Sequence, residues 1–114
     1  MKINIEKKGI LTIASLEETR LDASVAPDFK QRMEQIVAEG NTQIILDLSR
    51  LTFMDSSSLG ATVAILKFMG SQGKIVISGA SGVVLELFKL TRMDRVFTLK
   101  GNINEAEEYF AQAA

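Results

Sequence analysis

The chain has no cysteine, no histidine and no tryptophan among its 114 residues. Without cysteine it can form neither a disulfide nor a thiol nucleophile, and it lacks both residue types of the common Cys/His zinc sites. The absence of histidine also excludes a Ser-His-Asp triad and a histidine general base. Carboxylates, lysines, hydroxyls and backbone amides are what remains for chemistry. We therefore expect no enzyme activity, no catalytic residue, no metal site and no other cofactor.

The chain also lacks a surplus of charge and a long apolar run. Thirteen basic residues stand against fourteen acidic ones, which gives a net charge of -1. A protein that binds nucleic acid mainly through phosphates, or a membrane through a polybasic patch, needs a basic surplus. No apolar run approaches the roughly 20 residues of a spanning helix, and the N-terminus, MKINIEKKGI, lacks the apolar core of a signal peptide. We expect a cytoplasmic protein without nucleic-acid binding or membrane insertion.

The length fits one domain, residues 1–114, since domains most often hold roughly 100–150 residues. Apolar residues alternate in some segments, as in strands, and recur every three or four positions in others, as in helices. The predicted strands are 2–6, 10–16, 43–48, 74–78 and 95–99, and the predicted helices are 25–39, 57–69, 83–90 and 103–111. A polar loop is expected over 17–22. The predicted order is ββαβαβαβα.

This order predicts an α/β fold. The short turn at 7–9 makes the first two strands an antiparallel hairpin, and the later alternation of strands and helices indicates parallel βα units. Right-handed crossovers between neighbouring strands place their helices on one face of the sheet. Strand 43–48 agrees, because apolar and half-polar faces alternate along it. We expect a mixed, mostly parallel sheet with helices mainly on one face.

Residues 46–60, LDLSRLTFMDSSSLG, connect a predicted strand to a predicted helix. Asp55 and three serines lie at the start of that helix, and Ser24 lies at the start of the helix before it. Such residues favour helix N-termini because their oxygens accept hydrogen bonds from free backbone amides. The simplest interpretation is that Ser24 caps one helix and that Asp55 or Ser56 caps the other.

A second interpretation makes one of these serines an acceptor of phosphate. A helix N-terminus stabilises an anion, and a phosphoryl group adds about -1.5 to -2 charges and three acceptor oxygens. Asp55, and Asp22 in the preceding loop, would repel that charge. Three neighbouring hydroxyls without a general base suit phosphorylation better than catalysis.

The same residues carry a resemblance to the STAS domain family, and within it to the small single-domain anti-sigma factor antagonists. Asp55 to Gly60 reads DSSSLG, which is similar to the family signature Asp-Ser-Ser-Gly-Leu-Gly. Leu21-Asp22 matches the acidic loop before the first helix. The segments 78–81 and 94–97 resemble the C-terminal half of the family, so the likeness covers nearly the whole chain.

The resemblance implies a switch. Antagonists of this kind bind an anti-sigma factor that is a serine kinase of the GHKL type, and so release the sigma factor. The kinase phosphorylates the first serine after the signature aspartate, here Ser56 with Ser57 as the alternative, and a PP2C-type phosphatase reverses the change. The implied partner-binding residues are Asp22, Asp55, Ser56, Ser57, Ser58, Leu59 and Gly60.

Three questions stay open at the level of sequence. Ser58 replaces the usual glycine of the signature, so it is strained if that position needs a positive φ and unstrained if it is helical. The helix 57–69 is unusually apolar, and its outer side is either covered by neighbouring helices or exposed to a partner. Other STAS proteins serve transport systems or stress-signalling assemblies, where they bind a partner without phosphorylation.

Overall fold

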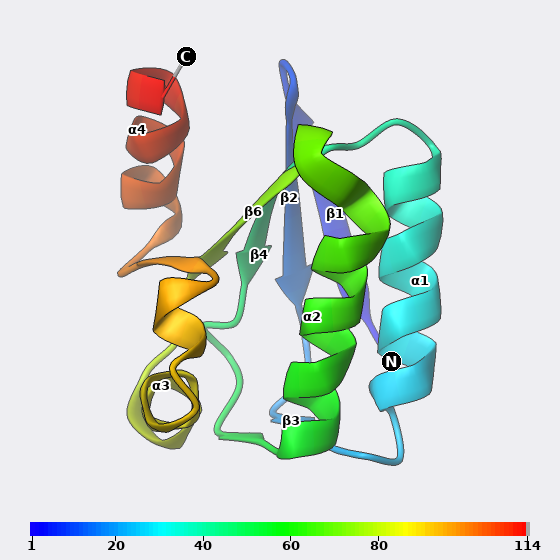
Figure 1. Cartoon of the computed structure of the whole chain (residues 1–114), viewed down its shortest axis with the longest axis vertical. Coiled ribbons are helices and arrows are strands. Elements are labelled where there is room, and N and C mark those ends of the chain that lie inside the picture. Colours follow the sequence, from blue (N-terminus) through cyan, green and yellow to red (C-terminus); the bar gives the residue numbers. More distant parts are fainter. Residues whose placement is uncertain (114) are drawn as a thin grey trace.

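A five-stranded sheet forms the centre of the computed structural model, which describes residues 1–113 (Figure 1). The strands follow the spatial order β1-β2-β4-β6-β7. β1 is antiparallel to β2, while the pairs β2–β4, β4–β6 and β6–β7 are parallel. This confirms the mixed, mostly parallel sheet. The strand bounds are β1 Ile3–Lys8, β2 Leu11–Leu16, β4 Gln43–Asp47, β6 Lys74–Ser78 and β7 Thr98–Lys100.

Three helices cover one face of the sheet and a fourth covers part of the other. The first three are α1 (Ala26–Ala38), α2 (Ser56–Met69) and α3 (Gly82–Leu90), and their buried residues share one core with the strands. α4 (Ile103–Ala113) packs on the opposite face. Short 3₁₀ turns at Gly70–Gln72 and Met93–Arg95 follow α2 and α3. The prediction that the helices lie mainly on one face of the sheet is therefore confirmed.

The alternation along β4 shows how the two faces are built. Ile44 and Leu46 are buried in the main core under α1, α2 and α3. Ile45 points the other way and packs with Ala106 of α4 in a second, smaller cluster. The predicted alternation of this strand is confirmed, and its less apolar face is the one that receives a single helix.

A second sheet was not foreseen. β3 (Arg20–Leu21) pairs in parallel with β5 (Phe53–Met54), inside the segments expected to be a polar loop and a strand-to-helix connection. Leu21 and Met54 are both buried. Two residues are too few to show an alternating pattern, and the pairing joins parts of the chain more than thirty residues apart, so no local signal marks it.

The last strand lies further along the chain than predicted. It covers Thr98–Lys100 instead of 95–99, because Met93–Arg95 form a 3₁₀ turn after α3. Phe97 then turns inward, is 2% exposed, and meets Phe88 of α3 edge to face with ring centres 6.0 Å apart. Phe97 is therefore a residue of the main hydrophobic core, and it lies directly before β7 in the chain and not within that strand.

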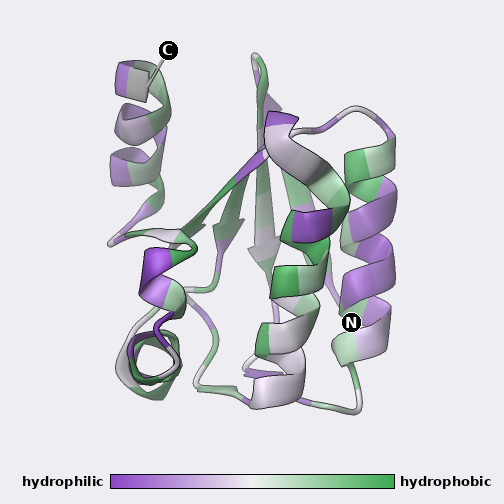
Figure 2. Ribbon diagram, in the orientation of Figure 1, coloured by the Kyte–Doolittle hydropathy of each residue, from purple (hydrophilic) through white to green (hydrophobic). Residues whose placement is uncertain are grey.

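The many apolar residues of α2 (Figure 2) are largely, but not wholly, buried. Leu59, Ile65 and Met69 are buried in the core, and α1 packs along one side of the helix. Phe68 remains 51% exposed near the C-terminal end of α2. Coverage by a neighbouring helix is therefore confirmed in part, and a partner surface on the exposed part of α2 stays a prediction.

Replacing Arg92 with glycine is expected to raise the free energy of unfolding by about 1 kcal/mol. Arg92 follows α3 with φ of 61°, and no other non-glycine residue among 1–113 has a positive φ. The left-handed conformation costs an L-residue roughly 1–2 kcal/mol and costs glycine little. Urea unfolding would measure the gain. Lys89→Gly within α3 is the control and should lose about 1 kcal/mol. A loss of stability in Arg92→Gly would contradict the assignment of strain.

Candidate functional site

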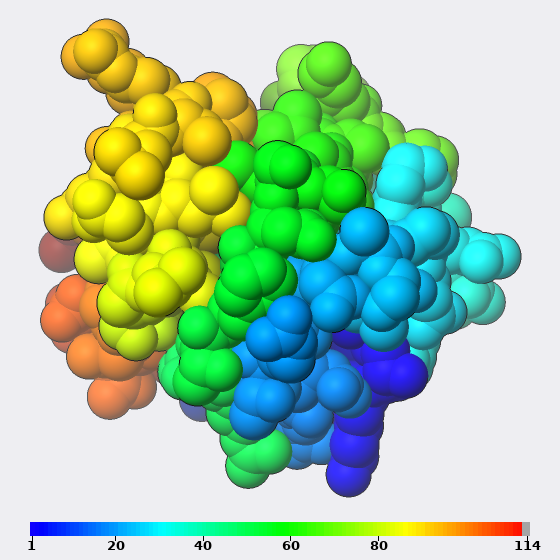
Figure 3. Space-filling model, turned by 90° about the horizontal axis from the view of Figure 1, so that it is seen from below, coloured from blue at the N-terminus to red at the C-terminus, as the bar shows by residue number. Residues whose placement is uncertain are grey.

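The first turn of α2 lies in the middle of one face of the molecule (Figure 3). On one side it borders α3, and on the other the connection that leads from β3 into α1. β3 and β5 bring these segments together, because they pair immediately before α1 and α2 begin. The predicted site residues from two distant parts of the sequence therefore meet on one surface.

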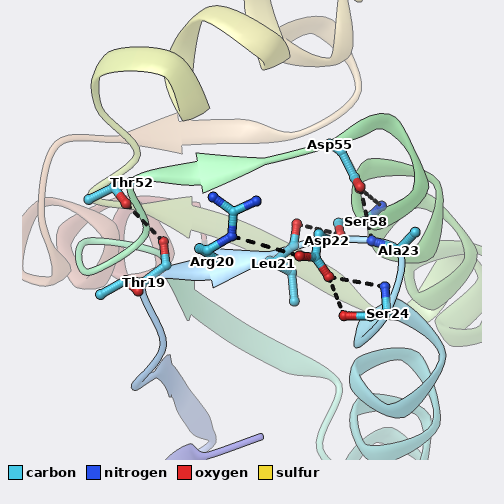
Figure 4. Close-up of polar contacts among 9 residues, drawn as sticks. All are labelled: Thr19, Arg20, Leu21, Asp22, Ala23, Ser24, Thr52, Asp55 and Ser58. Carbon is cyan, nitrogen blue, oxygen red and sulfur yellow. Dashed lines mark hydrogen bonds and ion pairs between the residues drawn. The ribbon is translucent and has the colours of Figure 1, made fainter.

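Asp55 holds the two segments together (Figure 4). It is the N-cap of α2, in an extended conformation, and its Oδ1 accepts a hydrogen bond of 3.0 Å from the amide of Ser58. Its Oδ2 accepts a second bond, of 2.9 Å, from the amide of Ala23 in the β3–α1 connection. The capping role is confirmed for Asp55, which in addition ties this connection to the helix.

Asp22 organises the connection itself. Its Oδ1 accepts bonds from the amide of Ser24, at 3.0 Å, and from the hydroxyl of Ser24, at 2.5 Å. Arg20 lies 3.8 Å from the other carboxylate oxygen. The prediction that Ser24 caps α1 was wrong. The N-cap is Val25, without a side-chain bond, because the hydroxyl of Ser24 is already donated to Asp22.

The three serines of the signature have different surroundings. Ser56 and Ser57 are exposed, whereas Ser58 is 0% exposed and its hydroxyl donates to the carbonyl of Leu21 at 2.6 Å. Ser58 lies within α2 and has no positive φ, so the replacement of glycine introduces no backbone strain there.

Burial divides the predicted partner-binding residues in the same way. Leu59 is 6% exposed and belongs to the hydrophobic core, and Ser58 is buried as well. Direct contact of these two side chains with a partner does not fit their burial, so any contribution they make is through the residues that they position. The others reach the surface: Asp22, Asp55, Ser56, Ser57 and Gly60.

Both carboxylates at the site are stabilised in their ionised form. The amide of Ser58, followed by that of Ala23, lowers the pKa of Asp55 below its ordinary value. The hydroxyl of Ser24, followed by its amide, lowers the pKa of Asp22. At neutral pH two negative charges therefore stand at the site: Asp55 directly before the exposed serines, and Asp22 in the connection that Asp55 holds.

Acid is expected to weaken the fold through these two groups. Their pKa values are lowered from 3.8, so the stabilisation is complete above pH 3.8 and is lost as the pH falls through the lowered values. Asp55→Asn keeps a capping side chain but removes one titrating group. As the pH falls below 3.8, its free energy of unfolding, measured with urea, should fall less than that of the wild type. Equal slopes would contradict this role of Asp55.

The profile of the STAS domain family matches residues 2–106. The chain belongs to the STAS domain family. The resemblance that the signature predicted is therefore confirmed, and the exposed serines of this STAS chain stand at the start of the helix after the signature aspartate.

Several proteins are similar to this STAS chain in sequence or in fold. An anti-sigma-B factor antagonist of Listeria monocytogenes is 28% identical over 101 residues, or 88% of this chain and 89% of that protein. A crystal structure of a candidate anti-sigma factor antagonist from Thermotoga maritima is 28% identical, with a TM-score of 0.85 over 94% of this chain and 92% of that one. An anti-sigma factor antagonist from Mycobacterium paratuberculosis shares the fold, with a TM-score of 0.86 at 20% identity over 95% and 92% of the two chains.

The helices of the described part of this STAS chain are too short or too polar to cross a bilayer.

Proposed function

We propose that this STAS protein is an anti-sigma factor antagonist, switched off by phosphorylation of Ser56. In this proposal it binds an anti-sigma factor that is a serine kinase of the GHKL type, and the sigma factor is released. The kinase phosphorylates Ser56, and a PP2C-type phosphatase removes the phosphate. The observation that carries the proposal is the exposed hydroxyl of Ser56 immediately after Asp55, at the first position of α2. The relatives from Listeria and Thermotoga support it by their names.

The choice of Ser56 rests on the different surroundings of the three serines. Ser58 is buried and its hydroxyl already donates to the Leu21 carbonyl. A kinase could reach this hydroxyl only if the bond were broken and the first turn of α2 were displaced. Ser56 and Ser57 are both accessible. Ser56 takes precedence because it directly follows the signature aspartate, which matches the acceptor position of the family, and Ser57 is the alternative.

The surroundings of Ser56 would make a phosphate effective as a signal. The first-turn amides of a helix favour an anion, so the modified serine need not unfold α2. The added charge of about -1.5 to -2 would be large against the net charge of -1. It would also stand beside the ionised carboxylates of Asp55 and Asp22. A partner surface that fits the neutral serine would therefore meet a strongly acidic one.

The division of labour in this proposal agrees with the composition. The chain supplies an acceptor hydroxyl and a contact surface, while the kinase supplies nucleotide and catalytic groups. No enzyme activity of its own is needed, and one STAS domain acting in the cytoplasm would fit the role.

The proposal is tested by incubating the protein with the GHKL-type serine kinases of the same genome and ATP, followed by mass spectrometry. We expect the wild type and Ser57→Ala to gain one phosphoryl group with at least one kinase, and Ser56→Ala to gain none. A gain that survives in Ser56→Ala would move the acceptor to another serine. No gain with any of the kinases would contradict the phosphorylation switch.

A further inference from the structure

Ser58 makes a connection that glycine at this position of the signature could not make. Its hydroxyl donates to the carbonyl of Leu21 at 2.6 Å, and both residues are 0% exposed. Leu21 is the last residue of β3, directly before the connection that carries Asp22. The only other described donor to this carbonyl is the amide of Asp55, at the longer distance of 3.4 Å.

The peptide of Ser58 is itself held on both sides. Its amide donates to Asp55 Oδ1, and its carbonyl accepts the hydroxyl of Thr62 one turn later, at 2.9 Å. Ser58 therefore cannot rotate freely within the first turn of α2. Because the backbone of Ser58 is fixed, its hydroxyl bond ties the Leu21 carbonyl, at the end of β3, to the first turn of α2. A movement of this turn should therefore also move the end of β3.

Two side-chain links thus cross from the start of α2 to the segment before α1. Asp55 reaches the amide of Ala23, and Ser58 reaches the carbonyl of Leu21. The two bonds enclose Asp22, whose own carboxylate holds Ser24. The connection that carries Asp22 and the helix start that carries Ser56 are therefore fastened at two points, one on either side of Asp22.

We propose that Ser58 is a positioning residue of the switch, which couples the β3–α1 connection to the first turn of α2 so that a charge added at Ser56 is transmitted to Asp22. The importance of Ser56 in this inference rests on the proposed function. The coupling itself is a property of the isolated protein, and it can be measured without any partner.

The first measurement is hydrogen exchange of the amides of Ala23 and Ser24. Removal of a buried hydrogen bond in Ser58→Ala should make these amides exchange about five- to tenfold faster. Ser78→Ala is the matched control, since it removes an equally buried serine hydroxyl whose bond, to Asp47, lies in the main sheet. Exchange at Ile45 in β4 reports global stability. Equal acceleration at Ile45 in Ser58→Ala, or acceleration of the Ala23 and Ser24 amides by Ser78→Ala as large as by Ser58→Ala, would overturn the local role of Ser58.

The second measurement tests transmission of charge. Ser56→Glu in the otherwise unchanged protein should shift the NMR signals of the Asp22 and Ala23 amides, and the same substitution combined with Ser58→Ala should shift them by less than half as much. The combination with Ser78→Ala should leave the full response. An undiminished response with Ser58→Ala, or no response in the first variant, would overturn the proposal.

The outcomes separate this inference from the proposed function. If no kinase modifies Ser56 but the response depends on Ser58, the coupling stands and the phosphorylation switch fails. If Ser56 is phosphorylated but the amide shifts caused by Ser56→Glu do not depend on Ser58, the phosphorylation switch stands and the positioning role fails.

Discussion

Ser56→Glu is expected to weaken binding to the serine-kinase partner by about a hundredfold. The substitution places a permanent negative charge at the first position of α2, directly after Asp55, whose carboxylate is bonded to the connection that carries Asp22. A charge buried in an interface without a counterion costs about 2–5 kcal/mol, and about 2.7 kcal/mol corresponds to a hundredfold change in the dissociation constant. Titration calorimetry with the kinase identified by phosphorylation would give the constants.

A matched substitution separates local charge from net charge. Ser71 is also exposed and lies in the 3₁₀ turn beyond the other end of α2. Ser71→Glu gives the protein the same net charge as Ser56→Glu, and we expect it to bind like the wild type. Unchanged binding by Ser56→Glu would refute the switch. An equal loss in both variants would show that overall charge, and not the position of Ser56, decides binding.

Phe88→Ala is expected to lower the free energy of unfolding by about 3–5 kcal/mol. Phe88 is 0% exposed, so its truncation removes a large buried side chain and leaves a cavity beneath α3. The edge-to-face contact with Phe97 is lost as well, which adds about 0.5–1.5 kcal/mol to the value of burial alone. Against a total stability of about 5–15 kcal/mol for a typical domain, this is a large share.

An exposed phenylalanine provides the comparison. Phe68 is 51% exposed on α2. When both variants are unfolded in urea, Phe68→Ala should lose well under half as much free energy of unfolding as Phe88→Ala. A loss below about 1 kcal/mol in Phe88→Ala would contradict the packing described here. Because α3 borders the first turn of α2, we also expect Phe88→Ala to weaken partner binding more than Phe68→Ala does.

The sequence was sufficient where structure depends on repeating local patterns. The alternation in β4 correctly predicted its two faces, and the order of strands and helices correctly predicted the main sheet. The pairing of β3 with β5 was not predicted, because Leu21 and Met54 belong to strands of only two residues whose partner lies far away in the sequence. Local periodicity carries no information about such a pair.

The site shows the same limit at the level of single residues. Asp55, Ser56 and their neighbours could be selected from the signature alone. Their different surroundings could not, because the burial of Ser58 depends on a backbone carbonyl of Leu21 that has no sequence signal. Ser24 was misassigned for a related reason: its side chain prefers Asp22, two residues earlier, to the free amides of α1.

The outer strand of the sheet has a consequence for self-association. β1 has a partner on one side only, so one row of its backbone amides and carbonyls is open to pairing with another chain, the route by which sheets grow into aggregates. Its exposed residues include Glu6, Lys7 and Lys8, and Lys8 also pairs with Glu107 of α4 at 3.3 Å. Charged side chains on an edge strand oppose such growth. For a regulator whose effect would depend on how many free copies meet their target, this charged edge favours a dispersed population.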